Sequence, residues 1–280
     1  MTQTSNPLRE FFRQPAIYVR LPSQGAHWPP GTLDLPENGE LPVLPMTAVD
    51  EITYRTPDAL YNGQSTVSVI HSCMPNIRNA WEMPVTDFDT ILIAIRIASY
   101  GHELDVSSTC PNCANEEQYS IDLRTILDKM RSPDFQTPLH RGDLEIHFRP
   151  LTYRQSTDNS IRQFEEQKML SLVGDANLTE EEKLQKLSGA MQQITAMTIK
   201  TLASCIALIK TPNTLVTESA HILEFLNNCD RAVFNQIRDH IVNLRSSTDI
   251  PPLKIRCAKC SHEYDQPFTL DQSNFFEAAS

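Results

Sequence analysis

The spacing of apolar residues predicts a chain that mixes amphipathic helices with short strands. The clearest early helix is 87–100, where aliphatic residues fill DFDTILIAIRIASY and Gly101 follows as a left-handed C-terminal cap. After residue 179, apolar residues recur every three or four positions, which predicts a helix that reaches about residue 209. By contrast, LEIHF at 144–148 alternates apolar and polar residues, as a strand with one buried face does.

Capping signals mark where several of these helices begin. Thr47 followed by Asp50, and Thr152 followed by Gln155, place a hydroxyl and a carboxyl or amide group three residues apart, as in a capping box. Because such pairs satisfy the first free N–H groups of a helix, they locate helix starts better than apolar spacing alone. Further helices are predicted at 65–74, 122–130, 152–173, 218–227 and 231–244.

The first 46 residues carry strand and turn signals instead. Residues 16–21 predict a short strand. Residues 33–35 and 41–44 flank Glu-Asn-Gly at 37–39, and this arrangement predicts a β-hairpin. We therefore expect an N-terminal arm followed by a β-rich region.

Four of the seven cysteines form two C-x-x-C pairs, and 143 residues lie between the pairs. The segments TCPNCANEEQYSIDL and RCAKCSHEYDQPFTLD share a polar turn, an aromatic residue and a strand, in that order. A C-x-x-C turn directs two sulfurs toward one point, and two such turns complete the tetrahedral shell of a structural zinc ion. We therefore expect one structural Zn²⁺ in a split zinc ribbon, with the ligands Cys110, Cys113, Cys257 and Cys260.

Other uses of these cysteines fit less well. Two redox dithiols are disfavoured because neither pair stands at the start of a helix after a strand. Disulfides are disfavoured because we expect a cytosolic product. An iron–sulfur cluster needs the same four thiolates, so the sequence does not separate it from zinc. His262 is an alternative ligand to Cys260, although two complete pairs make it unnecessary.

Composition excludes several functional classes. The net charge of −11 and the lack of a basic run argue against direct binding of nucleic acid. Only 8 glycines are present, and no phosphate-binding, nucleophile-elbow or zinc-protease motif occurs. Four thiolates would also leave a metal no open position for catalysis. We therefore expect no enzyme activity, and we expect Cys73 and Cys205 to be small core residues.

The chain lacks two sequence features that would direct a protein out of the cytosol or into a membrane. The N-terminal sequence lacks an apolar run of the kind that signal peptides carry. The most apolar helical stretch, 195–209, is interrupted by Lys200 and is too short to cross a bilayer. A cytosolic product with no membrane span is expected.

Together these signals predict an α+β fold with an N-terminal β-rich part, a split four-cysteine zinc ribbon and a long helical insertion between the two zinc knuckles. The expected divisions are an N-terminal arm and β-hairpin region at 1–46, a helical segment at 47–101, the split zinc ribbon at 102–123 with 253–271, and a strand plus helical insertion at 143–250.

Four motifs, in order, carry a family resemblance: YVRLPSQG at 18–25, LPMT at 44–47, ILIAIRIASYG at 91–101 and CPNC at 110–113. With them the chain resembles the baseplate hub protein family of T-even-like contractile-tailed bacteriophages. The resemblance covers about residues 17–123, and the later half of the chain resembles the family less distinctly.

The resemblance implies a structural component of a contractile-tail baseplate, in the hub or the tail-tip assembly. It implies assembly in the host cytoplasm, location in the virion, and partners among the other baseplate proteins and the tape-measure protein. Association with further copies of the chain is left open. The alternative is a tail assembly chaperone, which would hold the hub or the tape-measure protein and would not remain in the virion. A zinc-ribbon nucleic-acid binder and a metalloenzyme fit the acidic charge and the closed ligand set poorly.

Overall fold

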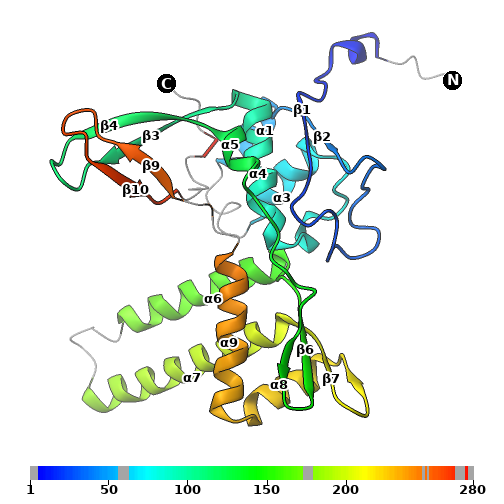
Figure 1. Cartoon of the computed structure of the whole chain (residues 1–280), viewed down its shortest axis with the longest axis vertical. Coiled ribbons are helices and arrows are strands. Elements are labelled where there is room, and N and C mark those ends of the chain that lie inside the picture. The colour runs from blue at the N-terminus through cyan, green and yellow to red at the C-terminus, as the bar shows by residue number, and fades with distance from the viewer. Residues whose placement is uncertain are drawn as a thin grey trace. The chain divides into compact units, whose positions relative to one another are not determined.

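The computed structural model describes residues 6–55, 63–172, 179–247, 250, 252–268 and 275–276 (Figure 1). Helices and strands both contribute to it, which confirms the α+β class. The chain divides into two compact units. Unit 1 comprises Met1–Ala80, Asp87–Met130 and Ile250–Ser280, and unit 2 comprises Trp81–Thr86 and Arg131–Asp249. Among the described residues, no helix has the length and hydropathy that crossing a bilayer requires.

Unit 1 is organised around helix α4 (Val85–Tyr100), which begins two residues before the predicted start. Every residue from 91 to 95 on this helix is fully buried. A helix that is apolar on all sides must be covered on all sides, so α4 forms the centre of the unit 1 core. The described elements before α4 are η1 (Pro7–Phe11), β1 (Ile17–Val19), β2 (Leu41–Val43), α1 (Ala48–Tyr54), α3 (Gln64–Cys73) and η2 (Ala80–Glu82), the last of which runs from unit 1 into unit 2.

The strand pairing near the N-terminus differs from the prediction. Strand β1 pairs antiparallel with β2, and Leu33 forms an isolated bridge with Ile77. The predicted hairpin between 33–35 and 41–44 is therefore wrong. The turn itself exists, since the Gly39 N–H donates to the Pro36 carbonyl at 2.8 Å. Local turn signals indicated a reversal of the chain but could not show that both flanking segments pair with distant residues.

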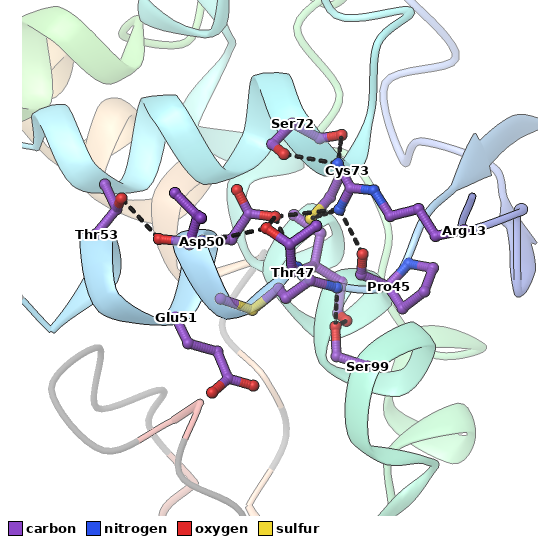
Figure 2. Close-up of polar contacts among 12 residues, drawn as sticks. Arg13, Pro45, Thr47, Asp50, Glu51, Thr53, Ser72, Cys73 and Ser99 are labelled. Carbon is purple, nitrogen blue, oxygen red and sulfur yellow. Dashed lines mark hydrogen bonds and ion pairs between the residues drawn. The ribbon is translucent and has the colours of Figure 1, made fainter. Parts of the chain in front are cut away.

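One guanidinium joins three segments of unit 1 (Figure 2). Arg13 donates to the Pro45 carbonyl, to Asp50 Oδ2 at 3.1 Å, and to both the carbonyl and the hydroxyl of Ser72 at 2.7 Å. Asp50 also accepts from the N–H and the hydroxyl of Thr47, both at 2.8 Å. These last contacts complete the predicted capping box of α1. Arg13 thus ties the N-terminal arm to the start of α1 and the end of α3.

A buried carboxylate ties a second N-terminal segment to the start of α4. Asp87 is fully buried and accepts from the N–H and hydroxyl of Ser23 and from Trp28 Nε1, the last at 2.8 Å. Burial raises the pKa of Asp87 even though these hydrogen bonds oppose the shift. The three bonds replace the water that the carboxylate loses, so residues 23–28 are held where their donors are needed.

Unit 2 contains a four-stranded antiparallel sheet in the order β5–β6–β7–β8. The last three helices of this unit contribute apolar side chains to the same core as the sheet. The strands are β5 (Leu139–Arg141), β6 (Leu144–Phe148), β7 (Ile206–Lys210) and β8 (Leu215–Val216), and the helices are α6 (Tyr153–Leu172), α7 (Glu180–Ser204), α8 (Ser219–Asn228) and α9 (Arg231–Ser246). The most buried residues of this core include Ile146, Ile206, Ile222, Leu226 and Ile237.

The helix predicted to reach residue 209 ends at Ser204, and the prediction was wrong beyond that point. The next residues form β7, in which Ile209 faces Ile146 of β6. A short apolar run fits a strand as well as a buried helix, and only the partner strand decides between them. Strands β5 and β8 were not predicted.

The second predicted capping box is also confirmed. Thr152 and Gln155 form a reciprocal capping box before α6. Asp122 accepts from the Arg124 N–H at the start of α5 (Leu123–Leu127), which is shorter than expected. Asp230 accepts from two N–H groups in the first turn of α9.

We predict that Arg13→Ala destabilises the protein by about 2 kcal/mol, because it leaves the buried Asp50 carboxylate without its cationic partner. Burial raises the pKa of Asp50, but hydrogen bonds from Thr47 and Ser72 and the charge of Arg13 outweigh it, so the native pKa is lowered. The contribution of ionised Asp50 is therefore present at neutral pH and is lost as the pH falls through that native pKa. Urea unfolding at neutral and acidic pH measures both effects.

Arg20→Ala is the matched control. Arg20 pairs with Glu40 at 3.1 Å, but its side chain is 70% exposed. An exposed pair contributes little, so a change within about 0.5 kcal/mol is expected. Equal losses in the two variants would contradict the role assigned to Arg13.

Candidate metal centre

Each C-x-x-C pair lies at the turn of an antiparallel hairpin (Figure 1). Cys110 and Cys113 join β3 (Glu103–Thr109) to β4 (Glu116–Asp122). Cys257 and Cys260 join β9 (Leu253–Arg256) to β10 (Glu263–Gln266). The two hairpins are separate two-stranded sheets, so no backbone ladder connects them.

The two turns have the same backbone geometry. In each, the N–H of the first cysteine donates to the carbonyl five residues later, and its carbonyl accepts from the N–H four residues later, at 2.9 Å in all four bonds. The residue after the second cysteine has a left-handed conformation, with φ of 53° at Ala114 and 58° at Ser261. Non-glycine residues adopt this conformation at a cost of about 1–2 kcal/mol, so its recurrence shows that both turns are held in one shape.

The four sulfurs meet across the hairpins in crossed pairs. Cys110 Sγ lies 3.7 Å from Cys260 Sγ, and Cys113 Sγ lies 3.7 Å from Cys257 Sγ. All four sulfurs are within 4.8 Å of one another. A tetrahedral ion with metal–sulfur bonds of about 2.3 Å has sulfurs about 3.8 Å apart. The cluster therefore has the donor set and nearly the spacing of a four-thiolate metal site, and the prediction that these cysteines come together is confirmed.

Hydrogen bonds to sulfur make the four thiols unequal. The His262 backbone N–H and the Asn112 amide, at 3.6 Å, lower the pKa of Cys260 to about 6. At Cys113 the Asn115 backbone N–H acts in the same direction, but desolvation and contact with the other three thiols outweigh it and raise the pKa to about 12. Four adjacent thiolates repel one another, so a bound cation is needed to hold all four ionised.

A hydroxyl links the two hairpins beside the cluster. Ser108 of β3 is buried, and its oxygen lies 2.9 Å from the Tyr264 hydroxyl and 2.7 Å from Gln266 Oε1. The sequence left His262 as an alternative ligand to Cys260. In the structure Cys260 belongs to the cluster, and the His262 ring stacks on Tyr264 with ring centroids 6.2 Å apart. Sequence reasoning found the sulfurs but missed Ser108 and Asn112. Asn112 lies inside the first C-x-x-C, where a polar side chain was the only available signal.

The other cysteines stand apart from the cluster. Cys73 and Cys205 are buried, as predicted for small core residues. Burial raises the pKa of the Cys73 thiol to about 12 and that of Cys205 to about 11, so both are unreactive thiols at neutral pH. Cys229 is half-buried at the end of α8.

A family model described as T4 bacteriophage base plate protein matches residues 33–277. The match includes both cysteine turns and all of unit 2. The chain belongs to this family. No curated protein and no solved structure matched the chain.

Membership in the T4 base plate family confirms the resemblance drawn from the sequence to T4-like baseplate proteins. It identifies a structural component of a phage baseplate, which associates with other baseplate proteins. It also shows that the likeness extends over the later half of the chain, where the motifs were less distinct.

We predict that Ser108→Ala lowers the free energy of unfolding by about 1–2 kcal/mol, because it removes the buried oxygen that bonds Tyr264 and Gln266 of the other hairpin. Ser107 precedes it on the exposed side of the same strand, so Ser107→Ala is the control and should change stability by less than about 0.5 kcal/mol. Thermal unfolding of both variants, each with its metal content measured, makes the comparison. Equal stability of the two variants would show that the hydroxyl bridge is unimportant.

Proposed function

We propose that the protein is a component of the baseplate hub or tail tip, and that one structural Zn²⁺ bound by Cys110, Cys113, Cys257 and Cys260 holds its fold. The crossed pairing of the sulfurs at 3.7 Å carries the metal assignment, and the family match supports the place in the baseplate. This pairing brings together two turns that lie 143 residues apart within the family match, in a geometry that a metal ion fits and that hydrophobic burial does not explain.

The site suits a structural zinc ion better than a catalytic metal ion. Four sulfur donors from two C-x-x-C turns fill a tetrahedral shell and leave no position for water or substrate. A closed site of this kind supplies folding free energy, on the order of 10 kcal/mol at neutral pH, and no catalysis. The cost of closing the long loop between the turns grows only with the logarithm of its length, so the separation along the chain does not oppose binding.

A structural role also agrees with the rest of the chain. We propose that residues 143–250 are a strand and helical insertion between the two knuckles, and that the surfaces outside the cluster bind other hub or tail-tip proteins, with the tape-measure protein among the candidate partners. On this proposal the protein is built in the host cytoplasm and remains in the virion. The alternative role of a tail assembly chaperone predicts the same metal site but a different fate.

The metal assignment predicts one equivalent of zinc per chain by elemental analysis of protein purified without added metal. The Cys110→Ser/Cys257→Ser double variant removes one ligand from each turn, so it should lose the metal and most of its resistance to unfolding. Cys229→Ser is the control, since this thiol lies outside the cluster. Full zinc content and wild-type stability in the double variant would defeat the shared site, and iron in place of zinc would correct the identity of the ion.

The baseplate assignment predicts that the protein is found in purified phage particles. Quantitative mass spectrometry of virions and of isolated baseplates should detect it in constant proportion to other baseplate proteins. Immunogold labelling of isolated baseplates should place it at the centre. Absence from virions together with presence on assembly intermediates would instead establish the chaperone role.

A further inference from the structure

Unit 2 contains a cavity that the baseplate assignment does not explain. Its volume is about 180 Å³, and it lies where the ends of β6, α7 and α9 meet the start of α4 and the loop at 133–135. Its apolar wall comes from Phe135, Phe148, Ile241 and Leu244. An apolar cavity of about 150 Å³ can hold a benzene-sized group, so this one has room for one aliphatic or aromatic side chain.

Two arginines stand at the same cavity. Arg149 and Arg245 both line it, and none of its described lining residues is acidic. Both guanidiniums are near enough to the Cys205 thiol to lower its pKa, against the larger effect of burial, which raises it. The two cations therefore converge on one region. In a chain with a net charge of −11, a cavity lined by two arginines and, in the described part of the chain, by no carboxylate departs from the general surface.

The position of Arg149 suits an external anion. Its Nε donates to the Ser204 carbonyl at 3.1 Å, which fixes the side chain along the end of α7. Its terminal amino groups have no hydrogen-bond partner among the described residues, and they are the groups that bind a carboxylate in a bidentate manner.

A buried hydroxyl adds a further polar atom. Thr86 lines the cavity, and its Oγ1 is buried without a hydrogen-bond partner in the described part of the chain. A buried polar atom of this kind costs free energy unless something satisfies it, and a polar ligand group in the cavity would do so.

We propose that this cavity binds the C-terminal residue of a partner polypeptide, with an apolar side chain inside the cavity and the terminal carboxylate on Arg149 and Arg245. The last residue of a polypeptide carries its side chain and its terminal carboxylate on one Cα atom. A last residue with an apolar side chain therefore matches an apolar wall that lies beside two guanidiniums. The proposal names a class of partner for the interaction role proposed above and rests on that role. It concerns a unit that does not contain the cysteine cluster.

The test is fluorescence anisotropy with full-length, metal-replete protein and labelled Gly/Ser peptides that end in Leu or Phe. Peptides with a free carboxylate should bind, and the same peptides with a C-terminal amide should bind on the order of tenfold more weakly, since charge-assisted hydrogen bonds are lost. Arg149→Gln and Arg245→Gln should each weaken the free-carboxylate peptide by a similar factor. Arg231→Gln removes an arginine from the exposed start of α9, outside the cavity, and should bind as the wild type does.

Several outcomes would overturn the proposal. The first is equal binding of the amide and carboxylate forms, and the second is wild-type binding by both cavity variants. A third is no detectable binding of any peptide to wild-type protein whose unfolding curve and metal content are normal. Decanoate that binds as tightly as the Leu-ended peptide and competes with it would assign the cavity to free carboxylic acids instead. None of these results bears on whether the protein is present in virions, so the proposed function is tested separately.

Discussion

The hairpin region of unit 1 depends on one constraint, which is the contact between sulfurs of the two hairpins. Cys110 Sγ meets Cys260 Sγ, and Cys113 Sγ meets Cys257 Sγ. Two-stranded hairpins are at best marginally stable alone. Here β3 and β9 contribute one buried side chain each, Ser108 and Ile255, while β4 and β10 contribute none. Hydrophobic burial therefore contributes little to holding the hairpins together. The sulfur cluster and the Ser108 bridge supply the cross-connection, and a cation would remove the repulsion that otherwise opposes it.

The helical part of unit 1 is held in a different way. The buried middle of α4 supplies the apolar core, and two charged side chains attach the N-terminal segments to the helices around it. Arg13 reaches three segments through one guanidinium, and Asp87 collects donors from Ser23 and Trp28. Because each charge loses water on burial, each needs several partners at once, and this need fixes the path of a chain that has little regular structure of its own.

The sequence predicted features that depend on near neighbours. Capping pairs such as Thr47 with Asp50, the alternation of 144–148 and the spacing inside each C-x-x-C all act within a few residues, and the structure contains them. The repeat of the cysteine motif also predicted one long-range contact, because two half-sites imply a shared centre. Pairings without such a marker were missed. Nothing near Leu33 indicates Ile77 as its partner, and Ile206 to Ile209 became a strand only because β6 lies beside it.

The unit 2 cavity is a second feature that the sequence did not predict. Arg149 follows a strand and Arg245 lies in the last turn of a helix almost a hundred residues later, so neither is marked by a motif. They converge because β6 and α9 share one apolar core, in which Phe148 and Ile241 are both buried. Burial of apolar residues is non-directional and tolerates many sequences, whereas two guanidiniums beside an apolar cavity select one kind of ligand. In this chain the cysteine cluster connects the two hairpins, and the packing of an ordinary core creates a cavity whose two guanidiniums suit an anionic partner.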